Sequence, residues 1–176
     1  EWDQDLLSGY PYVWLRNRAK NPSLVSFSGC DTPEIAEIIR REQFSAFLVL
    51  GWYCKSMWQA MRACWQTQTP LWVRGDSHLY METPAWKKIL KEITHRLFMP
   101  RFDACFAVGS CSADFFSHYG AKKIFRSPHF VDNGWFSEQA GQARLNRDKI
   151  REAFGIPKES TVFLFVGKFE EKKRPL

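Results

Sequence analysis

The sequence lacks the residue spacings that zinc sites and disulfide frameworks require. Its five cysteines form no C-x-x-C pair, and its four histidines show neither an H-x-x-x-H nor a Cys/His spacing, so no metal site is expected from them. The cysteine count is odd, and Cys54, Cys64 and Cys105 lie in apolar patterns. These features favour reduced structural thiols in a cytosolic protein over a disulfide framework.

Long apolar runs, internal repeats and low-complexity tracts are also absent. No apolar run approaches the ~18 residues that cross a bilayer, and the acidic start EWDQD is not typical of a signal peptide. We therefore expect a cytoplasmic location. Because the first residue is not Met, we also expect the chain to be a fragment of a longer protein.

The composition indicates a folded, basic chain. Its 176 residues are 45% apolar and 16% aromatic, which is enough for a substantial core and argues against intrinsic disorder. The net charge of +6 favours anionic partners such as phosphorylated ligands, acidic membranes or nucleic acid. A nucleic-acid partner is not expected, because the sequence has no recognised binding motif and no dense stripe of Arg and Lys.

Strand and helix patterns alternate along the chain. Apolar runs predict strands at residues 24–27, 44–50, 70–73, 103–108, 123–125 and 162–166. Helical spacing and capping residues predict helices at 32–41, 56–66, 84–99, 110–120 and 146–154. This order predicts an α/β fold with a Rossmann-like, doubly wound and mostly parallel sheet.

A change in composition predicts the domain organisation. Residues 137–147 are polar, with no apolar face before Leu145, and are expected to be a linker. They would separate an N-terminal domain, residues 1–136, from the beginning of a second Rossmann-like domain, residues 148–176.

The last predicted strand carries a candidate anion site at its carboxyl end. The apolar run ends at Gly167, and Lys168, Lys172, Lys173 and Arg174 follow. Glycine allows a ligand to approach the backbone closely, and α/β sheets bind ligands at the carboxyl ends of their strands. Ammonium groups at such a position suit a diphosphate. A solvated charged surface is the alternative.

Three other junctions place polar or small residues directly after a predicted strand. The first is Arg74-Gly75-Asp76-Ser77-His78, where Asp and His supply an acceptor and a titratable donor; a simple turn is the alternative. For the second, Gly51-Trp52-Tyr53, a turn glycine followed by two packing aromatics is the favoured interpretation. The third, Gly109-Ser110, offers a helix N-terminus to an anion, although capping by Ser110 explains it equally well.

Two further patterns have competing interpretations. Asp3-Gln4-Asp5 has the D-x-D form of metal-dependent sugar transferases, but no strand precedes it to orient the carboxylates, so a metal site is not expected. The helix predicted over residues 86–98 is basic and amphipathic. It suits either peripheral contact with the inner face of an anionic membrane or a core-facing helix with a solvated side.

Taken in order, the motifs FLVLGW, PLWVRGDSH, FDACFAVGSCSADFFSHYGAKKIFRSPHFVD and REAFGIPKESTVFLFVGKFEEKKRP resemble the retaining glycosyltransferases of family 4, which have the two-domain GT-B fold. The resemblance implies that Lys168 and Lys173, with Gly167, bind the diphosphate of a nucleotide-sugar. It places His78 at the donor sugar as the catalytic-site histidine. It also implies that a set of residues at the ends of neighbouring strands lines the cleft. These are Gly51, Trp52, Arg74, Asp76, Gly109, Ser110 and Asp132.

The resemblance implies transfer of a sugar from a nucleotide-diphosphate sugar to a glycan, lipid or other hydroxyl acceptor, with retention of configuration and without metal or cofactor. A non-catalytic phosphate- or nucleotide-binding domain is the alternative, because fold alone does not confer function. Two positions depart from the family pattern: His129 stands where Asn is usual, and Lys168 where Arg is commoner. The family's Gly-rich loop and its two-Glu motif have no counterpart in these residues.

Overall fold

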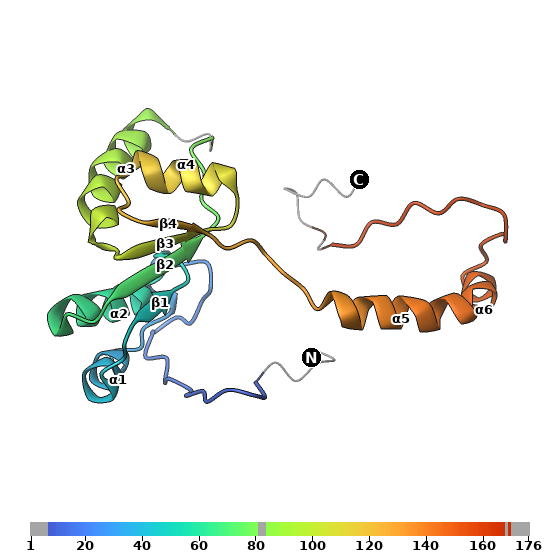
Figure 1. Cartoon of the computed structure of the whole chain (residues 1–176), viewed down its shortest axis with the longest axis horizontal. Helices are drawn as coiled ribbons and strands as arrows, with labels where there is room; N and C mark the ends of the chain where they lie inside the picture. Colours follow the sequence, from blue (N-terminus) through green and yellow to red (C-terminus); the bar gives the residue numbers. More distant parts are fainter. Residues whose placement is uncertain (1–6, 81–83, 168, 170–176) are drawn as a thin grey trace. The chain divides into compact units, whose positions relative to one another are not determined.

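The computed structural model describes residues 7–80, 84–167 and 169. The chain divides into two compact units, Glu1–His129 and Phe130–Leu176. Figure 1 shows the first unit in blue to yellow and the second in orange to red. The first unit contains the sheet, and the second contains two helices followed by an extended segment.

The sheet of the first unit has four parallel strands in the order β1-β2-β3-β4. Neighbours in the sheet are also neighbours in the sequence, so each connection crosses over through a helix. The α/β class and the parallel, Rossmann-like sheet predicted from the sequence are confirmed. The strands are β1 (Phe47–Val49), β2 (Leu71–Gly75), β3 (Ala104–Ala107) and β4 (Ile124–Arg126).

The core lies between one face of this sheet and the helices. Leu71 and Val73 of β2 and Cys105 and Ala107 of β3 are buried on the same face, because alternate residues of a strand point the same way. The helices that connect the strands pack on that face. The helical segments are η1 (Phe27–Gly29), α1 (Ile35–Glu42), α2 (Lys55–Thr67), α3 (Ala85–Phe98), η2 (Met99–Arg101) and α4 (Ser110–His118).

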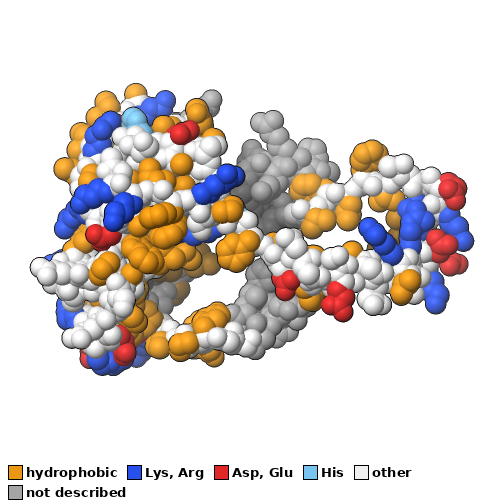
Figure 2. Space-filling model, viewed as in Figure 1, with side chains coloured by type: hydrophobic (Ala, Val, Ile, Leu, Met, Phe, Trp, Pro, Cys, Tyr) orange, Lys and Arg blue, Asp and Glu red, His pale blue; other side chains and the backbone are white. Residues whose placement is uncertain are grey.

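The opposite face of the sheet carries an aromatic row that no described helix covers. The rings of Trp72 and Phe106 lie 5.6 Å apart, and the rings of Phe106 and Phe125 also lie 5.6 Å apart. Leu48, in register with Trp72, is exposed as well. Figure 2 shows hydrophobic side chains gathered over the strands of the first unit, with Lys and Arg side chains around them.

Two predicted strands are wrong. Residues 24–27 end in the short helix η1 rather than forming a strand. Residues 162–166 are extended but exposed, and they are assigned to no strand. A strand is stabilised by hydrogen bonds to neighbouring strands, and none of the four described strands pairs with this segment. An apolar run in the sequence does not show whether a neighbouring strand is present to form these hydrogen bonds.

The second unit begins with helix α5 (Asn133–Leu145), which contains most of the predicted linker. None of its residues is buried, and the segment predicted to be a linker is helical. Helix α6 (Arg147–Ala153) follows, and Gly155 ends it with a φ of +64°. The Arg151 guanidinium donates to the carbonyls of Pro157 and Ser160, which fixes the loop after α6 against that helix.

Candidate functional site

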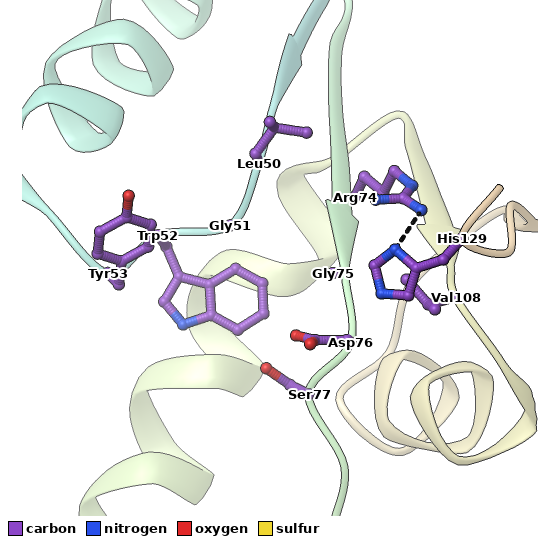
Figure 3. A pocket seen from close by; sticks show the side chains of 10 residues that line it. All are labelled: Leu50, Gly51, Trp52, Tyr53, Arg74, Gly75, Asp76, Ser77, Val108 and His129. Atoms are coloured by element: carbon purple, nitrogen blue, oxygen red, sulfur yellow. Dashed lines mark hydrogen bonds between the residues drawn. The ribbon is translucent and has the colours of Figure 1, made fainter. Parts of the chain in front are cut away.

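A cavity of about 380 Å³ opens at the carboxyl ends of the strands in the first unit. Its walls come from the loops after β1 and β2, the end of β3 and the loop after β4, so segments far apart in the sequence meet there (Figure 3). This is the edge at which parallel α/β sheets bind ligands. The lining residues are Leu50, Gly51, Trp52, Tyr53, Arg74, Gly75, Asp76, Ser77, Val108 and His129.

Gly51 allows the chain to turn sharply into this cavity. Its φ is +93°, a backbone conformation that residues with a Cβ rarely adopt. The turn is held from the next helix, because Nε1 of Trp58 donates to the carbonyl of Trp52 over 2.9 Å. The sequence alone had favoured a turn glycine with packing aromatics at this position, and the positive φ confirms the turn.

The Trp52 side chain belongs to both the cavity and the core. Its ring centroid lies 5.5 Å from those of His95 and Phe98 and 6.0 Å from that of Phe115, to which it is nearly parallel. These contacts fix the orientation of the indole. The cavity therefore has one wall that is a rigid aromatic surface.

Asp76 and Ser77 supply the polar groups opposite this indole. In Figure 3 the Asp76 carboxylate and the Ser77 hydroxyl both point toward the Trp52 ring. Asp76 is exposed, and within the described part of the chain its carboxylate belongs to no ion pair of 4.0 Å or less. Both groups thus remain available to bind the hydroxyl groups of a ligand.

Arg74 organises the other side of the cavity. Its Nε donates to the Ser127 hydroxyl at 3.2 Å, and its terminal nitrogen donates to the carbonyls of Ser127 and Pro128, each at 3.2 Å. The same nitrogen lies 3.4 Å from Nδ1 of His129 (Figure 3). The predicted cleft residue Arg74 does line the cavity, and its contacts hold the loop that follows β4.

His129 enters the site through this loop. Guanidinium groups only donate hydrogen bonds, so Nδ1 of His129 is the acceptor in this contact. In the sequence, His129 was notable only because the family pattern usually has Asn at this position. Its place beside Arg74 depends on the order of strands in the sheet, which no local motif encodes.

His78, expected beside the donor sugar, does not line this cavity. It lines a neighbouring one of about 280 Å³, together with residues of α3 and α4. Its ring lies 6.2 Å from that of Tyr80 and is exposed. In that second cavity Glu92 contacts Nε2 of His118 at 3.0 Å, and this hydrogen bond is the main reason that the pKa of the Glu92 carboxyl is lowered.

The remaining predicted residues of the first unit lie at the edge of the site. Gly109, not Ser110, is the N-cap of α4, and its N–H donates to the Ser112 hydroxyl at 2.9 Å. The prediction that Ser110 caps the helix is wrong, because Ser110 is already its first residue. Neither Gly109 nor Ser110 lines the cavity, whereas the preceding Val108 does.

The predicted residues of the second unit have local roles or are not described. Asp132 is the N-cap of α5, where its carboxylate accepts from the N–H of Trp135 at 2.9 Å. Gly167 lies exposed at a bend. Lys168 and Lys173 lie outside the described residues. The assignment of Gly167, Lys168 and Lys173 to a diphosphate site, and that of Asp132 to the cleft, stay predictions.

A half-buried histidine lies beneath the cavity. The ring of His95 is surrounded by Trp52, Phe98, Phe115 and Tyr119, and burial in this apolar environment lowers its pKa. Its Nδ1–H donates to the carbonyl of Lys91 at 2.8 Å. Within residues 7–80, 84–167 and 169, no group of three or more His, Cys, Asp or Glu could hold a metal ion.

Comparison of the chain with protein-family models, with curated proteins and with solved structures found no match. Of the helices in the described part of the chain, none has the length and apolar character needed to cross a membrane.

Proposed function

We propose that this chain is the acceptor-side part of a glycosyltransferase that moves a sugar from a nucleotide-diphosphate sugar to a hydroxyl of a glycan, lipid or other acceptor. Two independent arguments support the proposal. The ordered motifs of the sequence resemble retaining glycosyltransferases of family 4. The cavity at the strand ends of the first unit has the chemistry that a sugar requires.

The observation that carries the proposal is the pairing of free polar groups with an aromatic wall. Asp76 and Ser77 point toward the Trp52 ring across the cavity. A sugar has hydroxyl groups around its rim and apolar C–H groups on its faces, so it can bind a carboxylate and a hydroxyl while one face lies on an indole. A cavity of about 380 Å³ falls within the usual range for small-molecule sites.

In the proposed reaction, the bond between the anomeric carbon and the diphosphate breaks. Negative charge develops on the departing diphosphate, and fixed cations stabilise that charge most in the transition state. The sequence assigns this role to Lys168 and Lys173. The acceptor hydroxyl attacks on the face from which the diphosphate departs and gives its proton to the leaving phosphate, so no carboxylate base is required. Asp76 would then orient the acceptor.

Activity is best tested in the complete open reading frame, because the resemblance implies a longer enzyme. Release of nucleoside diphosphate from a panel of nucleotide-sugars identifies the donor, and Asp76→Asn then tests the cavity. Loss of a charge-assisted hydrogen bond of about 1–3 kcal/mol should lower kcat/KM for the acceptor by ~10- to 100-fold. The matched control is Asp114→Asn, an exposed carboxylate of α4, which should leave kcat/KM unchanged.

Two results would contradict the proposal. Equal activity of Asp76→Asn and the unaltered enzyme would remove the cavity from acceptor binding. Binding of nucleoside diphosphates without transfer or hydrolysis of any nucleotide-sugar would instead support a non-catalytic nucleotide-binding domain.

A further inference from the structure

Helix α3 presents its apolar side to solvent. Five of its large hydrophobic side chains are more than half exposed, from 54% for Leu90 to 70% for Leu97. Their spacing of three and four residues places them on one face of the helix. In Figure 2 hydrophobic side chains follow the outer edge of the region that α3 occupies in Figure 1. The five residues of this outer face are Trp86, Ile89, Leu90, Ile93 and Leu97.

The side of α3 that packs against the protein is mostly polar. Phe98 is the one residue of this helix that is buried. His95 lies half-buried among aromatic rings, and Glu92 forms ion pairs with Arg96 and with His118 of α4. This arrangement reverses the usual pattern for a helix on a globular domain, in which the apolar stripe faces the core. The outer face therefore is not explained by the packing of the first unit.

The helix is also strongly basic. Its sequence AWKKILKEITHRLF carries four Lys or Arg residues and one carboxylate. The Lys87 ammonium lies 5.3 Å from the centre of the Trp86 ring, at the start of the exposed apolar face. Lys88 and Lys91 line the second cavity with His78. Since Glu92 is already paired with Arg96 and His118, the lysines remain available to an external anion.

We propose that the outer face of α3 binds the surface of a membrane that contains anionic lipids. An exposed apolar face with Trp86 and the neighbouring Lys87 at one end matches helices that lie in the lipid interface. The apolar side chains would enter the acyl boundary, and Lys87 would contact the lipid phosphates. Charge complementarity favours this partner over a neutral protein surface. The proposal does not depend on glycosyl transfer.

The consequence for the site follows from the topology. Helix α3 follows β2, and Lys88 near its start lines the same cavity as His78, directly after the Asp76-Ser77 loop. The first turn of α3 therefore lies near the edge of the sheet that carries the candidate site. Binding through α3 would bring this edge close to the membrane surface.

The test is co-sedimentation of the chain with vesicles of phosphatidylcholine mixed with phosphatidylglycerol, compared with vesicles of phosphatidylcholine alone. The unaltered chain should sediment with the mixed vesicles and be released by high salt, because counterions screen the attraction. Ile89→Ser/Ile93→Ser should weaken the partition coefficient ~10-fold or more. Its control is Val25→Ser/Phe130→Ser, which alters two exposed apolar residues outside α3 and should bind as the unaltered chain does.

A second pair of variants tests the charges. Lys87→Gln should weaken binding by about fivefold. Lys122→Gln removes one exposed lysine elsewhere and should weaken binding much less. All substituted α3 residues are exposed, so circular dichroism should show an unchanged fold.

Three outcomes would overturn the proposal. One is equal sedimentation of the unaltered chain and Ile89→Ser/Ile93→Ser. Another is binding to phosphatidylcholine alone that matches binding to the mixed vesicles. The third is a dimer that light scattering detects without lipid and that Ile89→Ser/Ile93→Ser dissociates, which would assign the outer face to a second copy of the chain.

Discussion

The guanidinium of Arg74 lies 3.4 Å from Nδ1 of His129, and the same side chain donates to the carbonyls of Ser127 and Pro128. One residue at the end of β2 thus fixes the loop that follows β4, across the intervening strand β3. The planar guanidinium can make these contacts together, whereas a lysine ammonium has no such fork of donors. The wall of the cavity that contains His129 depends on this arginine.

Arg74→Ala should therefore loosen the loop at residues 127–129. We expect the free energy of unfolding to fall by about 1–2 kcal/mol, because several charge-assisted hydrogen bonds to a partly exposed group are lost. Arg74→Lys should recover little of this loss. Urea unfolding measures the effect, and Arg126→Ala, on the exposed end of β4, is the control. Equal stability of Arg74→Ala and the control would show that the loop is held by other contacts.

Gly51→Ala should strain the turn after β1. At a φ of +93° an added Cβ costs about 1–2 kcal/mol, which urea unfolding should detect as a lower midpoint with an unchanged slope. Gly141→Ala is the control. Gly141 lies inside helix α5 and is not among the described glycines with a positive φ, and a Cβ there meets no atom within 4 Å in the described structure. If the two variants were equally stable, the positive φ at Gly51 would be contradicted.

The cysteines should differ sharply in reactivity. Burial raises the pKa of the Cys64 thiol to about 11 and that of Cys105 to about 12, from an ordinary value of 9.0. Their thiolate fractions should be about 100- to 1,000-fold lower than that of a free cysteine, and burial also blocks the reagent. In a native titration with a disulfide reagent, exposed Cys111 should react first. Rapid modification of Cys64 or Cys105 before denaturation would contradict their burial.

His95 should make the stability of the first unit sensitive to mildly acidic pH. Its folded-state pKa is lowered from 6.5, mainly by burial, so the unfolded chain binds a proton at a pH where the folded chain does not. The free energy of unfolding should therefore fall as the pH drops below 6.5 toward the folded-state value. His95→Gln should flatten this part of the profile relative to the unaltered chain. An unchanged slope after the substitution would exclude His95 as its source.

The sequence predicted the parts of the fold that depend on local patterns. Apolar runs followed by glycine located β1, and the alternation of strands with helices of the right length gave the parallel sheet. The same reasoning failed at residues 162–166, because the run is as apolar as a buried strand but pairs with no described strand. An apolar run identifies a segment that could form a strand. It does not identify the neighbouring strand with which that segment would pair.

The candidate site was only partly predicted, because some of its contacts join residues that are distant in the sequence. Gly51, Trp52, Arg74 and Asp76 follow their strands directly, so their presence at one edge of the sheet could be inferred. The role of Arg74 as a clamp on residues 127–129 could not, because it depends on the order of strands and on a side-chain contact across 53 residues or more. His78 lies in the neighbouring cavity because the chain moves away from the sheet after Ser77.

The aromatic row of Trp72, Phe106 and Phe125 lies on the side of the sheet away from the helices, with Trp72 and Phe125 exposed and Phe106 half-buried between them. This row has a practical consequence. Salts such as ammonium sulfate strengthen the tendency of apolar surface to leave water. The purified chain should accordingly salt out at lower ammonium sulfate concentrations than a chain of equal size whose sheet is covered on both sides.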